Sequence, residues 1–258
     1  MAQAGDAENL RNLRRLHTRR AIAERLDSEH SHSYLRDFIY GAIDGAVTTF
    51  AVVAGVTGAG LSSGVIIVLG AANLLADGFS MAASNYLGTR AERQRVDKLR
   101  GFEEQQIDVY PRGEREEIRQ IMERKGFRGR DLKRAVNVVT ADRRLWVDTM
   151  LQEEWGLSQY VPSPFRAALT TFLAFLGVGL LPLAPYLLAW TGGADGARSF
   201  YTSMLLTGLA FFVTGALKSR HVVQHWLLAG LETLVVGGLA AILSYWVGYA
   251  LRAVAAFS

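Results

Sequence analysis

The sequence predicts an all-α membrane protein with five transmembrane helices and a helical cytoplasmic insert between the second and the third. Charged residues make up 20% of the 258 positions, yet they are nearly absent from five long apolar stretches. Each stretch has the roughly 20 residues that a helix needs to cross a hydrocarbon core ~30 Å thick. Lysine and arginine gather in a few of the segments between these stretches, which is typical of cytoplasmic loops.

Helices are the simplest structure for these stretches, because backbone polar groups within lipid must be hydrogen-bonded internally. The expected spans cover residues 38–60, 64–88, 167–190, 200–217 and 226–251. They divide the chain into five parts. These are an N-terminal tail (residues 1–36), two spans (37–90), the insert (91–163), three spans (164–251) and a C-terminal tail (252–258).

The distribution of positive charge predicts the orientation of the chain. Of the 28 lysines and arginines, all but Arg198 and Arg252 lie in the N-terminal tail, between the second and third spans or between the fourth and fifth. Because cytoplasmic loops carry such an excess, we expect the N-terminus and the insert in the cytoplasm and the C-terminus outside. Basic loops beside a lipid bilayer then explain the net charge of +4, and no nucleic-acid partner is expected.

The insert is expected to form three helices, at residues 91–106, 113–125 and 131–155. Pro111 separates the first two, because proline disfavours helical geometry at and before its own position. Gly126 ends the second, as glycine often does just after a helix.

The N-terminal tail allows two interpretations. Residues 7–26 are compatible with a basic amphipathic helix on anionic lipid and equally with a mobile segment. His30 and His32 form an isolated pair in this tail, which we interpret as part of a flexible segment rather than as a metal site.

Three carboxylates lie inside expected spans: Asp44, Asp77 and Glu232. A charge near the bilayer centre costs ~2.5 kcal/mol or more on insertion scales, so each carboxylate needs a partner or a function. Gly41 and Gly45 flank Asp44 at a spacing that lets another helix approach closely. Asp44 either pairs with a polar neighbour for packing or binds a transported ion, and we favour the second interpretation.

The second span carries four side chains at steps of four residues: Asn73, Asp77, Met81 and Asn85. Four residues correspond to about 400° of rotation, so the four form one stripe that we expect to face the bundle interior. Oxygen and thioether ligands together suit a transition metal such as Fe²⁺ better than Ca²⁺ or Mg²⁺. A methionine in an apolar helix is as often simple packing. We interpret Glu232 as structural, paired with Arg220 or reaching the membrane surface.

Acidic residues of the insert form a second candidate site. Glu114 and Glu117 lie three residues apart and therefore on one face of their helix. Glu103 ends the preceding helix, and Met150 and Glu154 lie four apart on the following one. Packing of the three helices would bring these groups together. From the pattern alone, a solvated acidic surface is the favoured alternative.

Several enzyme signatures are missing from the sequence. It contains no His-Glu-x-x-His motif and no P-loop. We therefore expect a protein that is not an enzyme. Two other classes stay open: a membrane-embedded metal oxidase, and a non-transporting scaffold whose insert binds partners.

Two blocks of sequence, at residues 34–55 and 72–87, resemble the first two spans of the vacuolar iron transporter family. Shorter blocks at residues 164–169 and 230–241 are similar to its third and fifth spans. The resemblance implies a homodimer of five-span protomers with an ion path at the dimer interface. It also implies export of Fe²⁺, or of Mn²⁺, from the cytoplasm in exchange for protons.

The resemblance also implies roles for particular residues. Asp44 and Met81 match the aspartate and the methionine that line the family's ion path. The positions that match its cytoplasmic metal-binding domain are Glu103, Glu114, Glu117, Met150 and Glu154. No cofactor beyond the transported ion is implied. The membrane would be the plasma membrane in a bacterium, or a vacuolar-type membrane in a eukaryote.

Three positions depart from the family pattern. Gln106 stands where a glutamate is expected, and Leu151 where a second methionine is common. Asn73 replaces a carboxylate found in many members, although Asp77 one turn later could substitute for it. A site with fewer carboxylates attracts cations less strongly. We therefore expect the insert to bind metal more weakly, or to bind fewer ions.

Overall fold

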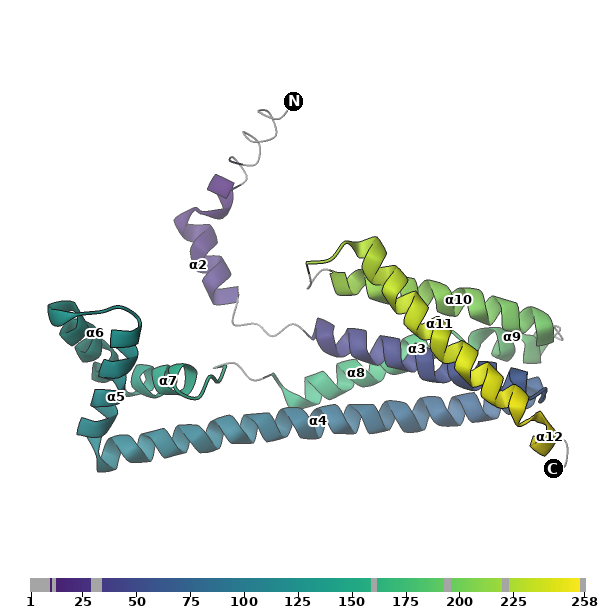
Figure 1. The fold of residues 1–258 in the computed structure, drawn as a ribbon, viewed down its shortest axis with the longest axis horizontal. Coiled ribbons are helices and arrows are strands. Elements are labelled where there is room, and N and C mark those ends of the chain that lie inside the picture. The colour runs from purple at the N-terminus through teal and green to yellow at the C-terminus, as the bar shows by residue number, and fades with distance from the viewer. Residues whose placement is uncertain are drawn as a thin grey trace. The chain divides into compact units, whose positions relative to one another are not determined.

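The computed structural model describes residues 10, 13–28, 34–158, 162–192, 196–219 and 223–255. These residues form helices and turns and no strand, which confirms the all-α prediction (Figure 1). Their contacts divide the chain into two compact units. We call them the insert unit, Met1–Ser33 with Ala91–Pro162, and the membrane unit, Tyr34–Arg90 with Ser163–Ser258. His30 and His32 lie outside the described residues.

The membrane unit is built from apolar helices. Their bounds are Leu35–Gly58 for α3, Ser63–Val109 for α4, Pro164–Gly179 for α8, Ala184–Gly192 for α9, Gly196–Lys218 for α10, Trp226–Ala250 for α11 and Arg252–Ala255 for α12. Among the described residues, α3, α4, α10 and α11 are each long and apolar enough to cross a membrane.

The stretch expected as the third span is a bent pair of helices. The angle between α8 and α9 is 56°, and the two together are long enough for a fifth span. The bend surrounds Pro182, whose carbonyl oxygen accepts a hydrogen bond of 2.7 Å from the Ser203 hydroxyl. This bond satisfies a backbone acceptor at the bend, as an apolar environment requires. The described residues therefore contain four candidate spans, or five when the bent pair counts as one.

Helix α4 continues without a break through 47 residues. The expected second span and the expected first helix of the insert are thus one helix. It ends where Tyr110 adopts a non-helical conformation, with φ −141° and ψ 65°, and Pro111 is the first residue of the next helix. Proline is well suited to this position, because it has no backbone N–H and its φ is already fixed near the helical value.

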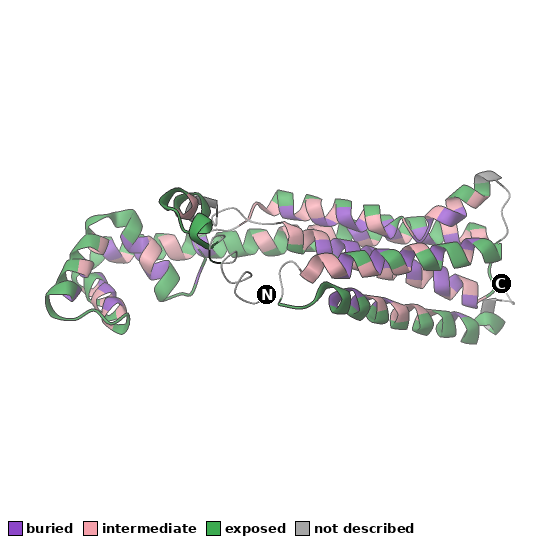
Figure 2. Cartoon of the chain, turned by 90° about the horizontal axis from the view of Figure 1, so that it is seen from above, coloured by how far each residue is buried: buried purple, intermediate pink, exposed green. Residues whose placement is uncertain are grey.

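Glycines allow the helices of the membrane unit to pack closely. A Cβ built on Gly45 of α3 would lie 2.9 Å from Cα of Phe175 on α8. A Cβ on Gly248 of α11 would lie 2.8 Å from the carbonyl carbon of Gly55 on α3. Such backbone contact is how helices pack within lipid. Figure 2 shows buried positions interspersed with exposed ones along these helices.

The remainder of the insert unit contains α5 (Pro111–Arg124), α6 (Gly129–Ala141) and α7 (Arg143–Glu153), and the tail contains α2 (Arg19–Ser28). The prediction of one helix over residues 131–155 was wrong. Asp142 interrupts it with φ −113° and ψ 116°, and its carboxylate accepts hydrogen bonds from the backbone N–H groups of Arg144 and Leu145. Asp142 is thus the N-cap of α7.

Candidate functional site

Two carboxylates are buried in the insert unit. Glu103 on α4 is 0% exposed and Glu114 on α5 is 3% exposed. The Trp155 indole N–H donates a hydrogen bond of 2.7 Å to one oxygen of Glu103. The Oε2 atoms of both carboxyl groups have no hydrogen-bond partner among the described residues. Burying an ionised group is unfavourable unless it is paired. Protonation of either group lets Glu103 and Glu114 hydrogen-bond to each other, and with both ionised these oxygens lack a donor.

Two further glutamates interact electrostatically with this buried pair. Burial raises the pKa of Glu114 to about 7, with added repulsion from Glu117, Glu103 and Glu154. Burial likewise raises the pKa of Glu103 and of Glu154, and Glu117 adds to both effects. Glu117 is therefore the common neighbour, and four of the predicted site residues gather in one place. We call them the acidic cluster.

The acidic cluster is not assembled around a fixed cation position. Within the part of the chain that the structure describes, no three acidic or histidine side chains lie close enough to hold a metal ion together. A hollow of about 270 Å³ borders the cluster, lined in part by Glu117, Ile121 and Glu154. Solvent therefore reaches the half-buried Glu117 and the exposed Glu154 on this side of the cluster.

The remaining predicted residues of the insert have different environments. Met150 on α7 is 0% exposed and belongs to an apolar core that includes Ile118 and Leu151. Gln106 is half-buried on α4, three residues after Glu103 and so on the same face. The structure thus places Met150 in packing, and Gln106 offers a neutral amide where an additional charge was expected.

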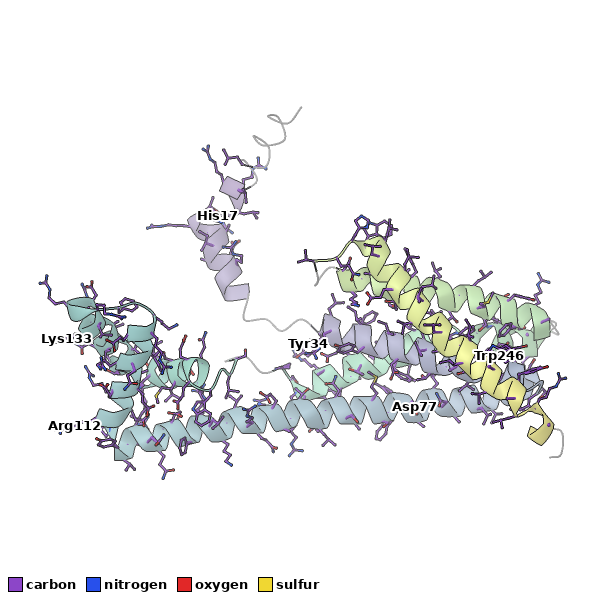
Figure 3. The ribbon with its side chains drawn as sticks, viewed as in Figure 1. His17, Tyr34, Asp77, Arg112, Lys133 and Trp246 are labelled. Carbon is purple, nitrogen blue, oxygen red and sulfur yellow. The ribbon has the colours of Figure 1, made fainter. Side chains whose placement is uncertain are left out.

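The membrane unit brings Asp44 and Asp77 together. Asp44 is half-buried on α3, and Asp77 is close enough for its charge to act on Asp44. Figure 3 labels Asp77 on α4. Neither residue takes part in an ion pair within the described part of the chain. Two carboxylates without a cationic partner repel each other within an apolar helix bundle, and a bound cation would remove this repulsion.

Asn73 and Met81 occupy the same stripe of α4 in different ways. The Asn73 side-chain amide nitrogen is buried and has no hydrogen-bond partner among the described residues. Met81 is partly buried against an apolar cluster that includes Phe50 and Phe175. Asn73 and Asp77 are therefore polar groups without a fixed partner, whereas Met81 also serves the packing of the core.

Comparison with known proteins identifies the chain. A family model described as the VIT family matches residues 35–249. The chain belongs to the VIT family. It is 32% identical over 231 residues to the vacuolar iron transporter of Toxoplasma gondii. The match covers 87% of this chain and 76% of that relative. It is 30% identical to vacuolar iron transporter 1 of Tulipa gesneriana, over 90% of this chain and 95% of the relative.

Sequence reasoning missed a polar clamp in this VIT-family protein. The Asn85 side-chain amide donates hydrogen bonds to Asp37 at 2.9 Å and to the Thr171 hydroxyl at 2.7 Å. The Thr89 hydroxyl in turn donates to the Asn85 amide oxygen at 3.2 Å. The clamp ties together α3, α4 and α8. Asn85 is therefore held by fixed partners, unlike Asn73 in the same stripe.

Two other VIT-family residues qualify the sequence interpretation. Trp155 donates the hydrogen bond to Glu103. Its position directly after Glu154 is the feature of the sequence that could have indicated this role. The Glu232 carboxylate lies 3.4 Å from the Lys218 ammonium group, in agreement with a structural role. The expected alternative partner, Arg220, lies outside the described residues.

Proposed function

We propose that this protein is a transporter that exports Fe²⁺, and also Mn²⁺, from the cytoplasm in exchange for protons. The observation that carries the proposal is a set of carboxylates without cationic partners, both in the insert unit and inside an apolar helix bundle. The relatives named vacuolar iron transporters support iron as the cargo. The membrane is a plasma membrane in a bacterium or a vacuolar-type membrane in a eukaryote.

The acidic cluster captures the ion first in this proposal. Negative charge at Glu103, Glu114, Glu117 and Glu154 raises the local concentration of divalent cations. The unpartnered oxygens of the two buried glutamates become ligands when the ion displaces their shared protons. Met150 supplies a thioether once its side chain turns out of the core, a ligand that favours Fe²⁺ over Mg²⁺.

The ion then passes to Asp44 and Met81 within the membrane unit. Asp77 and Asn73 provide further oxygen ligands along the same stripe of α4. A homodimer duplicates this set about a two-fold axis, which gives the path two copies of each residue. Protonation of Asp44 from the far side neutralises the carboxylate and releases the ion. Loss of that proton before the next ion binds couples the two fluxes.

A flux assay with purified protein in liposomes tests the proposal. We expect Fe²⁺ to enter the lumen, Mn²⁺ to compete, and a lumenal pH dye to report loss of protons at the same time. Mg²⁺ at the same concentration should compete weakly. Protein-free liposomes provide the control. Metal uptake without a pH change would remove the proton coupling, and absence of uptake for every divalent ion would contradict transport.

A further inference from the structure

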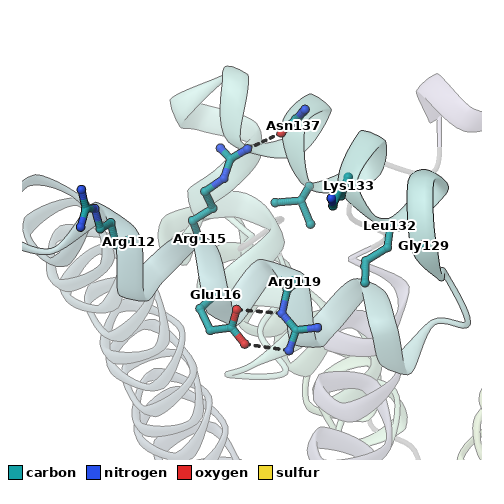
Figure 4. Close-up of a pocket in the computed structure, with 9 residues that line it drawn as sticks. Arg112, Arg115, Glu116, Arg119, Gly129, Leu132, Lys133 and Asn137 are labelled. Atoms are coloured by element: carbon teal, nitrogen blue, oxygen red, sulfur yellow. Dashed lines mark hydrogen bonds and ion pairs between the residues drawn. The ribbon is translucent and has the colours of Figure 1, made fainter.

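A groove on the insert unit carries charge of the opposite sign to the acidic cluster. It lies between α5 and α6, has a volume of about 590 Å³, and shares no lining residue with the cluster (Figure 4). Four cationic side chains and one carboxylate line it, above a floor that includes Leu132: Arg112, Arg115, Arg119, Lys133 and Glu116. The volume is within the range of sites for small molecules.

One of these four cations is already neutralised by carboxylates. The Arg119 guanidinium donates two hydrogen bonds to Glu116, at 2.7 and 2.8 Å, and a third of 3.0 Å to Glu123. This fork-shaped pairing occupies most of the donors of Arg119. Glu116 therefore does not neutralise the other cations of the groove.

The remaining three cations have no carboxylate partner among the ion pairs of the described residues. Arg115 is held in place by neutral groups only, because it donates to the Asn137 side-chain oxygen and, at 2.5 Å, to the Thr140 hydroxyl. A guanidinium has five N–H donors, so several remain for a ligand. Arg112 and Lys133 are among the residues that line the same groove.

Two helix N-termini add positive potential. Arg112 lies in the first turn of α5, and Gly129 is the first residue of α6 and lines the groove. Neither helix has a side-chain hydrogen bond at its N-cap, Tyr110 for α5 and Arg128 for α6. At the start of α6 the N–H groups of the first turn and the helix dipole favour an anion. The start of α5 contributes less, because Pro111 has no N–H and the amides of Gly113 and Glu114 donate to the Tyr110 carbonyl.

We propose that this groove is a binding site for a small anion that carries phosphate groups. Three cations without carboxylate partners repel one another, and a phosphate group accepts bidentate hydrogen bonds from a fixed guanidinium such as that of Arg115. The buried side chains of Leu132 and Val136 supply an apolar surface for the rest of the ligand. The phosphate belongs either to a soluble ester or to a phospholipid headgroup. The inference is independent of metal transport.

Titration of the full-length protein in detergent with pyrophosphate tests this site, in metal-free buffer at roughly physiological ionic strength. We expect saturable binding that Arg112→Gln/Lys133→Gln weakens by about tenfold or more, since charge-assisted hydrogen bonds are lost. The matched control is Arg130→Gln/Arg134→Gln, which removes the same charge from exposed positions outside the groove. Equal weakening in both variants, or no saturable binding, would overturn the proposal. A thermal melt of each variant checks that it is folded.

The two sources of phosphate are separated by repeating the titration in nanodiscs. If a lipid headgroup occupies the groove, pyrophosphate binds more weakly in discs that contain phosphatidic acid than in discs of phosphatidylcholine. This difference should disappear in Arg112→Gln/Lys133→Gln. Equal binding in both discs supports a soluble ester as the ligand. Absence of pyrophosphate binding in detergent and in both kinds of disc contradicts a phosphate site.

Discussion

Asp44→Asn is expected to lower the initial rate of Fe²⁺ uptake into proteoliposomes at least about tenfold, since a charged ligand of the ion is lost. The substitution keeps the shape of the side chain and removes only its charge. Helix packing around Gly41 and Gly45 should therefore be unchanged. The uptake that remains should also lose its dependence on the pH gradient, because the proton-carrying group is gone.

Glu232→Gln is the matched control for Asp44→Asn. It removes one negative charge from a helix of the same unit, at a carboxylate that lies beside Lys218. We expect Glu232→Gln to retain most of the parent flux. If Asp44→Asn transports Fe²⁺ as fast as the parent, with the same pH dependence, the assignment of Asp44 to the ion path is wrong.

Gly45→Val is expected to prevent most of the protein from folding into the membrane unit described here. The first added carbon would lie 2.9 Å from Cα of Phe175, and a backbone atom cannot move aside as a flexible side chain can. Overpacking of this kind costs ~3 kcal/mol or more, a large fraction of typical stability. The measurement is the yield and thermal midpoint of monodisperse protein in detergent.

Gly177→Val provides the control for Gly45→Val. Gly177 is an exposed residue of α8, and a Cβ there would meet nothing within 4 Å. The same substitution should therefore leave the yield and the thermal midpoint close to those of the parent. Equal loss in the two variants would show that the close approach of α3 and α8 does not govern stability.

Apolar length predicted most of the spans within a few residues, because lipid imposes a simple requirement on each segment. The bend between α8 and α9 was not predicted, since average hydropathy does not register Pro182. The break at Asp142 was missed for a related reason. An aspartate becomes an N-cap only when the backbone before it turns away from helical geometry, and the residue pattern does not show such a turn.

The residue types of the acidic cluster were recognisable in the sequence, but their environments were not. The sequence pattern does not distinguish the environments of Glu103 and Glu154, yet Glu103 is fully buried and Glu154 is exposed. That difference arises from the packing of α4, α5 and α7 and from the hydrogen bond that Trp155 donates. The periodicity of residues along one helix predicts neither. The groove between α5 and α6 was missed because its cations come from two helices whose contact is tertiary.

The central claim is that unpartnered carboxylates of this protein hold a divalent cation. Equilibrium dialysis of Mn²⁺ against the full-length protein tests it most directly, at about pH 8 and about pH 6. Because the pKa of Glu114 is about 7, its carboxylate is mostly ionised at the higher pH and mostly protonated at the lower, so binding should weaken as the pH falls. Glu114→Gln/Glu117→Gln should abolish the bound Mn²⁺ of the insert at pH 8, whereas Glu92→Gln/Glu104→Gln, at exposed positions, should retain it. Equal Mn²⁺ occupancy in both double variants at about pH 8 would contradict the account.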